Sequence, residues 1–319
     1  MALCGTSEIS ALKTCEVENG PPKAPAAYKE IISTLPSENG WKVFQQLCFY
    51  QCFWCFPLHL EGAMYARHHF KAQPTDVLLC SAPKTGTPWL KALSVAIVTR
   101  NSAADNANNL LLNKVPHECI MFLEKDFIKN PTDQERLLRL VATHLPYAAL
   151  PKSILDAGCK IVYICRDPKD AFVSLWHFAR GRSNFGPYWD HVLGYWKASQ
   201  ESPEKVLFMN YEDLLGDTIN QVKRLAEFLG HPFSTEEEKQ GAVEKVISLC
   251  SLENLSNLEI NKTGKYGDAE KAIENTVYFR KGEVGDWKNY LTPEMGDQLD
   301  TIMEEKLSGS GFTFREPND

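Results

Sequence analysis

Short apolar runs alternate along the chain with stretches in which apolar residues recur every three or four positions. Short runs are typical of strands buried on both faces of a sheet, and the wider spacing is typical of amphipathic helices. Strands are predicted at residues 77–80, 119–123, 138–143, 160–165 and 205–210. Helices are predicted at residues 28–35, 89–98, 168–179, 219–229, 235–250 and 293–307. Because strands and helices alternate, we expect an α/β fold with a mostly parallel sheet.

Polar residues mark the starts of several predicted helices. Asp167 is expected to cap a helix whose first residue is Pro168. Asp217 is expected to cap the helix at 219–229, and Ser234 with Glu237 forms a predicted capping box.

Residues 76–100 read as a strand, a tight turn and a helix, with Lys84 and Gly86 in the turn and Pro88 near the first helical turn. A lysine beside the free N–H groups of a helix N-terminus forms a ready anion site. The alternative is an ordinary turn in which Gly86 supplies a positive φ angle. Lys84 precedes Gly86, so the turn departs from the nucleotide-kinase pattern G-x-x-x-x-G-K-[ST], which argues against a kinase.

Four residues whose side chains can bind a ligand or act in catalysis follow just after predicted strands. They are Lys84, His144, Arg166 and Tyr211. In open parallel sheets, ligands bind outside the carboxyl ends of the strands. We therefore expect these side chains to share one site.

The composition narrows the class of partner. The chain has 319 residues, 44% hydrophobic residues and a net charge of −7, which argues against a nucleic-acid partner. No apolar run reaches the roughly 18 residues of a membrane span. With no secretory signal, the ten cysteines are expected to be reduced thiols in the cytoplasm.

Residues 1–27 are polar and are predicted to form a flexible arm. Residues 28–319 contain no repeat or linker, so one domain is expected there.

The aromatic stretch at residues 41–70 leaves two interpretations open. It forms either strands and loops packed on the core, or an aromatic wall over an apolar pocket. Cys52 and Cys55 within it form a C-x-x-C with Cys48 nearby, but no second C-x-x-C exists to complete a zinc site. The remaining candidate ligands there are His59, His68 and His69.

Five motifs in this order carry a resemblance to a known family: PKTGTPW (83–89), ATHLP (142–146), CRDPKDAFVSLWHF (165–178), NYEDLL (210–215) and FRKGEVGDWKNYLTPEM (279–295). The chain resembles the soluble sulfotransferases that use 3′-phosphoadenylyl sulfate (PAPS), particularly the plant type, over roughly residues 41–314.

The resemblance implies a single α/β domain with a five-stranded parallel sheet and a P-loop-like phosphosulfate-binding turn. It implies PAPS as donor, PAP (the 3′,5′-bisphosphate) as product, no metal, and a hydroxylated acceptor such as a flavonoid, steroid or hydroxyjasmonate-like metabolite. His144 would be the catalytic base. Lys84 would neutralise charge on the leaving phosphate.

The resemblance also assigns binding roles. The phosphosulfate would lie against Lys84, Thr85, Gly86, Thr87, Pro88 and Trp89. The 3′-phosphate would lie against Arg166, Ser174, Arg280, Lys281 and Gly282, and the adenine beside Trp89, Tyr211, Cys250 and Leu252. Phe178 matches an acceptor-lining position, and Phe53 and Trp54 are further candidates for the acceptor pocket.

Two departures from the family pattern keep a second hypothesis open. Pro88 stands where the family usually has a threonine, and the segment after Phe178 is shorter than usual. The alternative function is a catalytically weak or inactive relative that binds PAP or PAPS. Lys288 and Thr292 match only part of an animal dimer motif, so a monomer or weak homodimer is expected.

Overall fold

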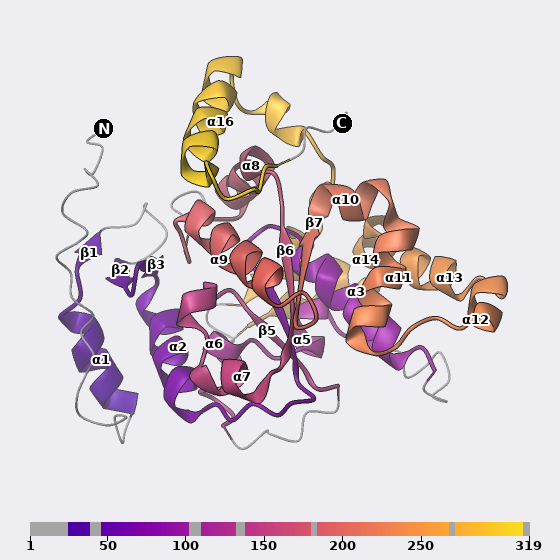
Figure 1. Cartoon of the computed structure of the whole chain (residues 1–319), viewed down its shortest axis with the longest axis horizontal. Helices are drawn as coiled ribbons and strands as arrows, with labels where there is room; N and C mark the ends of the chain where they lie inside the picture. The colour runs from indigo at the N-terminus through magenta and orange to yellow at the C-terminus, as the bar shows by residue number, and fades with distance from the viewer. Residues whose placement is uncertain are drawn as a thin grey trace.

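The computed structural model describes residues 25–38, 46–101, 110–131, 138–179, 184–267 and 272–314, and the arm predicted for residues 1–27 lies almost entirely outside them. Within these residues a sheet of four parallel strands lies between two layers of helices (Figure 1). The strands, in the spatial order β5-β4-β6-β7, are β4 Val77–Ser81, β5 Leu140–Thr143, β6 Lys160–Cys165 and β7 Val206–Asn210. The predicted α/β fold with a parallel sheet is confirmed.

The prediction of a strand at residues 119–123 is wrong. The helices α5 Pro116–Cys119 and α6 Leu123–Asp126 flank a single bridge between Phe122 and Ala142 of β5. The carboxylate of Asp126 accepts the N–H of Phe122 at 2.7 Å. Because this N–H is satisfied locally, the chain turns into α6 instead of extending a fifth strand.

Side chains alternate between the two faces of the sheet, as the pleat requires. In β4, Leu78 and Cys80 join one apolar core, and Val77 and Leu79 join the other. The first core lies under α2 Pro57–His69, α9 Tyr188–Glu201 and α16 Pro293–Leu307. The second lies under α3 Thr87–Thr99, α11 Thr218–Leu229 and α13 Ala242–Leu249. Both faces are covered, which explains the near-continuous apolar runs of the strands.

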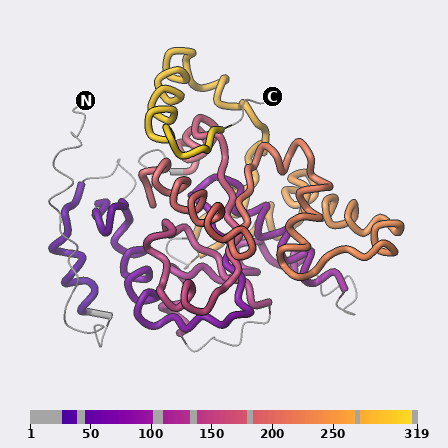
Figure 2. The backbone as a smooth tube through the Cα atoms, viewed as in Figure 1, coloured from indigo at the N-terminus to yellow at the C-terminus, as the bar shows by residue number. Residues whose placement is uncertain are grey.

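The other elements connect these layers, and α16 packs against α8 and α9 (Figure 2). They are α1 Pro25–Ser33, β1 Ser37–Glu38, β2 Leu47–Tyr50, β3 Phe53–Cys55, α4 Leu110–Asn113, η3 Tyr147–Ala149, α7 Lys152–Ala157, α8 Pro168–Ala179, α10 Tyr211–Gly216, α12 Thr235–Lys239, α14 Leu252–Asn257, α15 Glu259–Thr263, β8 Lys265–Tyr266, β9 Ile273–Glu274, η4 Asn275–Tyr278 and η5 Asp286–Asn289. No helix in the described ranges is long and apolar enough to cross a membrane.

Two of the three predicted helix caps are confirmed. The Asp167 carboxylate accepts the N–H of Lys169 at 2.8 Å, and the capping box at the start of α12 is complete. Asp217 precedes α11 as predicted, but its carboxylate accepts only from the side chain of Asn220. The predicted helix at 235–250 is two helices, because Gly241 adopts a φ of 71° between them.

The aromatic stretch folds as the β2–β3 hairpin followed by α2, with residues 39–45 outside the described part. Cys48 and Cys55 are buried opposite each other in the hairpin, and Cys52 lies exposed in its turn. No group of three or more His, Cys, Asp or Glu residues able to hold a metal occurs in the described residues.

Candidate active site

The register of the strands brings the predicted polar residues together at one edge of the sheet. β4 and β5 end so that Ser81 and His144 are neighbours, and β6 and β7 end so that Arg166 and Tyr211 are neighbours. The guanidinium of Arg166 lies over the Tyr211 ring, 4.5 Å from its centre. Lys84 follows β4 at the same edge, and the positive charge of Arg166 acts on it.

The turn between β4 and α3 is fixed by close packing. Gly86 has a φ of 112°, and a Cβ atom there would lie 2.9 Å from the Tyr211 ring, so no larger residue fits. The buried Thr85 hydroxyl lies 2.9 Å from the Ala82 carbonyl and 3.1 Å from that of Ile164. Thr85 therefore ties the turn to β6, and its hydroxyl is directed at the protein backbone.

The N-terminus of α3 supplies backbone donors at this turn. A helix leaves its first N–H groups without intrahelical partners, and here Gly86, Thr87 and Trp89 carry them. Pro88 lies in the first turn and has no N–H to offer. The Thr87 hydroxyl is 2.7 Å from that of Ser81, which links the turn to the end of β4.

His144 is held in one tautomer. Its Nδ1 lies 2.7 Å from the Ser81 carbonyl oxygen, which can only accept, so Nδ1 carries the proton and Nε2 carries a lone pair. Desolvation lowers the pKa of His144 to about 3, which keeps the ring neutral near pH 7. No described residue hydrogen-bonds to Nε2, so this nitrogen is available as a base.

Two buried ionisable groups hold the backbone of His144, and the sequence patterns gave no sign of either. The Glu124 carboxylate accepts the His144 N–H at 2.8 Å and the Thr143 hydroxyl at 2.8 Å. His191 Nε2 donates to the His144 carbonyl at 2.9 Å, and its Nδ1 lies 3.0 Å from the Tyr163 hydroxyl. Burial raises the pKa of Glu124 to about 7.

Lys84 lies at the mouth of the turn, half-buried, with a φ of 70°. Its Nζ is 3.3 Å from the Val277 carbonyl and 4.7 Å from the centre of the Phe178 ring. Desolvation lowers its pKa to about 8, and the positive charges of Arg280 and Arg166 add to the effect. These three cations repel one another, so the site favours an anionic ligand.

Arg166 is buried where α8 begins. Its guanidinium donates to the Glu283 carbonyl at 2.6 Å and lies 3.5 Å from the Asp170 carboxylate. Ser174 is also buried in α8, and its hydroxyl makes no hydrogen bond with a described residue.

The loop at residues 280–282 adds two further cations, which surround one carboxylate. Asp286 is buried and accepts from Arg280 at 2.5 Å and from Lys281 at 2.6 Å. Burial alone would raise the pKa of Asp286, but these hydrogen bonds hold it well below its usual range.

Asp170 joins this segment to α8. One of its carboxylate oxygens accepts the N–H of Gly285 at 2.8 Å, and the other accepts that of Trp287 at 2.9 Å. The same carboxylate lies beside Arg166, so the cations of the loop and the helix are positioned together. The sequence pattern does not predict this role of Asp170, because both partners lie more than a hundred residues away in the chain.

Buried hydrogen-bond donors without partners indicate the kind of ligand that the site could bind. The Nε atoms of Arg166 and Arg280 are buried and have no hydrogen-bond partner in the described part of the chain. Buried polar groups are normally paired, so such donors fit a bound anion. Two guanidinium donors of this kind fit a phosphate group.

The residues predicted beside the adenine fall into two groups. The Tyr211 ring meets Trp89 edge to face at 5.4 Å, and its hydroxyl donates to the Gly282 carbonyl at 2.8 Å. Leu252 lies against Gly282, where a Cβ atom would approach it to 3.0 Å. Cys250 is fully buried in the apolar core to which Tyr211 also belongs, so its thiol is not exposed to a ligand.

Aromatic residues surround His144 on the other side. The Phe185 ring lies 5.6 Å from the His144 ring and is stacked at 6.4 Å on the buried Phe53. Phe178, which the resemblance implied to line the acceptor pocket, lies beneath Lys84. Trp54 packs on Phe49 within the hairpin, at 5.1 Å. The shortened segment after Phe178 falls mainly on residues 180–183, outside the described residues.

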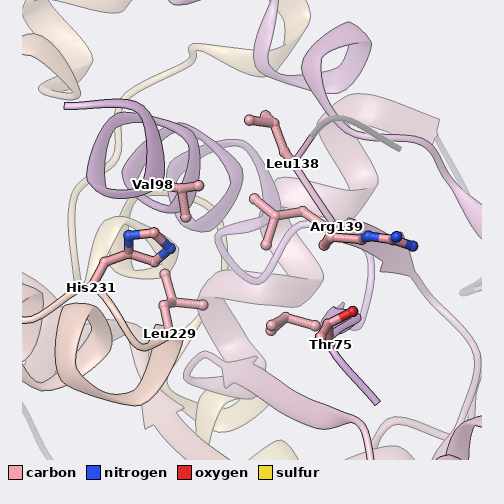
Figure 3. Close-up of a pocket in the computed structure, with 8 residues that line it drawn as sticks. Thr75, Val98, Leu138, Arg139, Leu229 and His231 are labelled. Atoms are coloured by element: carbon pink, nitrogen blue, oxygen red, sulfur yellow. The ribbon is translucent and has the colours of Figure 1, made fainter. Parts of the chain in front are cut away.

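A cavity of about 290 Å³ lies elsewhere, near the amino ends of β4 and β5 (Figure 3). None of the predicted site residues contributes to it. Its lining residues are Thr75, Val77, Val98, Leu138, Arg139, Leu140, Leu229 and His231.

Comparisons with known proteins identify the family of this chain. Residues 74–311 match the family model described as the sulfotransferase domain. A flavonol sulfotransferase-like protein of Flaveria bidentis is 49% identical over 311 residues, covering 90% of this chain and 100% of that protein. Flavonol 4′-sulfotransferase of Flaveria chlorifolia is 50% identical, with 90% and 96% covered, and cytosolic sulfotransferase 16 of Arabidopsis thaliana is 47% identical, with 91% and 93% covered.

Solved structures share the fold. A crystal structure of an Arabidopsis thaliana sulphotransferase superposes with a TM-score of 0.70 at 33% identity, covering 99% of both chains. A mouse sulfotransferase complexed with PAP superposes with a TM-score of 0.63 at 24% identity, covering 83% of this chain and 96% of that one.

Proposed function

The chain belongs to the sulfotransferase family, and on this basis we propose that it transfers a sulfuryl group from PAPS to a hydroxyl of a flavonol-like molecule, with His144 as base. The family membership confirms the resemblance found in the sequence, and the chain is a sulfotransferase. The flavonol-like acceptor is proposed because two relatives of about 50% identity carry flavonol sulfotransferase in their names.

The observation that carries the role of His144 is its fixed tautomer. Nδ1–H is bonded to the Ser81 carbonyl, which leaves the Nε2 lone pair to take a proton from an attacking hydroxyl. The ring is neutral near pH 7 because its pKa is lowered to about 3, so Nε2 is unprotonated before an acceptor binds. Glu124 and His191 hold the backbone and hence the ring position.

The cations would hold the donor in this proposal. Lys84 and the N–H groups at the start of α3 would face the phosphosulfate, and Lys84 would neutralise charge developing on the leaving phosphate oxygen. Arg166, Ser174 and the loop bearing Arg280 would hold the 3′-phosphate, which would pair the buried Nε donors. PAPS supplies the activated sulfuryl group.

The adenine would lie against Trp89, Tyr211 and the segment around Leu252 and Gly282, with Cys250 buried in the core to which Tyr211 belongs. Thr85 and Gly86 would contribute by holding the turn between β4 and α3 in its conformation. Phe178, Phe53 and Phe185 would line the acceptor side, with Trp54 behind Phe53 in the hairpin.

A test of the base is to replace His144 with alanine and measure transfer from radiolabelled PAPS to a flavonol. We expect a loss of about 10²–10⁴-fold in kcat, the range for removal of a general base, with the dissociation constant of PAP unchanged. His231→Ala is the control, because His231 is exposed beside the cavity at the other end of the sheet. An equal loss of PAP affinity would show that His144 is structural.

A non-catalytic relative is the second candidate, favoured by Pro88, which removes one N–H from the first turn of α3. Calorimetry with PAP, combined with the transfer assay over flavonols, steroids and hydroxyjasmonates, separates the two. Tight PAP binding with no turnover on any acceptor supports the second candidate.

We also propose that the protein acts in the cytosol, as the names of several relatives state for those proteins, and as a monomer or weak homodimer. Fractionation and sedimentation at micromolar concentration test these points.

A further inference from the structure

His59, first considered as a metal ligand, lies in the aromatic cluster next to His144. It is half-buried in α2 and stacked on Phe185, with ring centres 5.8 Å apart and planes at 16°. The same Phe185 ring contacts His144 at 5.6 Å. The two imidazoles are close enough for the charge of one to lower the pKa of the other. The two rings therefore belong to one aromatic cluster.

Hydrogen bonding sets the tautomer of His59. The Asn184 amide oxygen accepts the backbone N–H of Phe56 at 3.0 Å, which fixes the orientation of the amide group. Its NH₂ group therefore faces His59 Nδ1, at 3.0 Å, and donates to it. Burial lowers the pKa of His59 to about 4, so the ring is neutral near pH 7 and its single proton lies on Nε2.

The two histidines therefore present opposite chemistry. His144 has a lone pair on Nε2, whereas His59 has an N–H donor on Nε2. No described residue accepts a hydrogen bond from His59 Nε2. If a substrate covers this N–H without accepting its hydrogen bond, the unpaired donor costs free energy. A substrate with an oxygen that accepts this hydrogen bond is therefore favoured.

We propose that His59 donates a hydrogen bond to a second oxygen of the acceptor, while His144 takes the proton from the reacting hydroxyl. The substrate class is then a hydroxylated aromatic compound whose reacting hydroxyl has a carbonyl or ether oxygen close by. This inference rests on the proposed function, because it takes the space beside His144 as the acceptor site.

The test compares two acceptors, 3-hydroxyflavone, whose hydroxyl neighbours a carbonyl oxygen, and 2-naphthol, which has no second oxygen. Binding of each to the PAP-saturated protein is measured by fluorescence titration, and transfer by kcat/KM with PAPS. His59→Phe keeps an aromatic ring and removes the donor. His59→Gln keeps an N–H donor, and His68→Phe is the control, since His68 is exposed on the same helix.

We expect His59→Phe to weaken binding of 3-hydroxyflavone by about tenfold or more, and that of 2-naphthol by less than about twofold. His59→Gln should keep part of the preference, and His68→Phe should keep all of it. Equal effects of His59→Phe on both compounds, or no binding of either compound, would overturn the inference.

The binding and transfer readouts separate this inference from the proposed function. Selective loss of 3-hydroxyflavone binding in a protein that transfers no sulfuryl group would support the role of His59 and refute the proposed function. Transfer to both compounds with no selective loss in His59→Phe would support the proposed function and refute the role of His59.

Discussion

At the scale of single residues, the charge of Lys84 depends on pH in the mildly alkaline range. Its pKa is lowered to about 8 by desolvation and by Arg280 and Arg166, against an ordinary value near 10.5. A bound anion favours the protonated form and raises this pKa again. Above about pH 8, binding of PAP therefore requires uptake of a proton.

We predict that the dissociation constant of PAP is constant below about pH 8 and rises by up to tenfold per pH unit above it, because the free protein loses the charge of Lys84 there. Calorimetry at pH 7–9.5, in buffers of different ionisation enthalpy, measures both the affinity and the proton uptake. Lys84→Arg should flatten the profile, since a guanidinium stays charged. An unchanged slope in that variant would assign the proton to another group.

The location of the candidate site residues could be predicted from the sequence, whereas their supporting partners could not. His144 and Arg166 follow apolar strands, so their place at the sheet edge is a consequence of the pattern. Glu124 contacts His144 from 20 positions away, and Asn184 contacts His59 from 125 positions away. Local spacing contains no information on such pairs, because the fold brings them together.

At the scale of elements, Asp170 couples α8 to the loop that carries Arg280 and Lys281. We predict that Asp170→Asn weakens PAP binding by about 10–100-fold, because an amide can accept only one of the two N–H groups of Gly285 and Trp287 and places its NH₂ group toward the other. The loss corresponds to about 1.5–3 kcal/mol, the scale of a hydrogen bond to a charged group.

Calorimetry with PAP measures this effect, and Asp217→Asn is a matched control. Asp217 also lies at a helix start, but its carboxylate contacts only the exposed side chain of Asn220. Equal PAP affinity in Asp170→Asn and the native protein would mean that the loop is held in place by its other contacts.

The elements that could be predicted are those whose burial leaves a clear period in the sequence. β4 and β6 are central strands with both faces covered, so their apolar runs are unbroken. The run at 119–123 has the same composition, but Asp126 satisfies the Phe122 N–H and prevents a strand. Composition alone cannot distinguish these cases, because the deciding hydrogen bond comes from a side chain beyond the run.

At the scale of the whole molecule, the sheet separates the two halves of the site. The residues near Tyr211 and Trp89 pack with the core under α3, α11 and α13, whereas Phe53 and Phe185 belong to the core under α2 and α9. The two halves meet at the edge formed by Ser81, His144 and Lys84. If the donor binds to one half and the acceptor to the other, each should respond to changes in its own core.

We therefore predict that two variants affect different binding constants. Phe53→Leu removes the ring stacked on Phe185 and should raise the KM of the acceptor about tenfold, with the PAP dissociation constant within about twofold of native. Trp89→Leu removes the ring against Tyr211 and should weaken PAP about tenfold, while the acceptor KM at saturating PAPS changes little. Steady-state kinetics and calorimetry give the four constants. Parallel changes of both constants in both variants would contradict the separation, since they would mean that the sheet transmits packing changes from one core to the other.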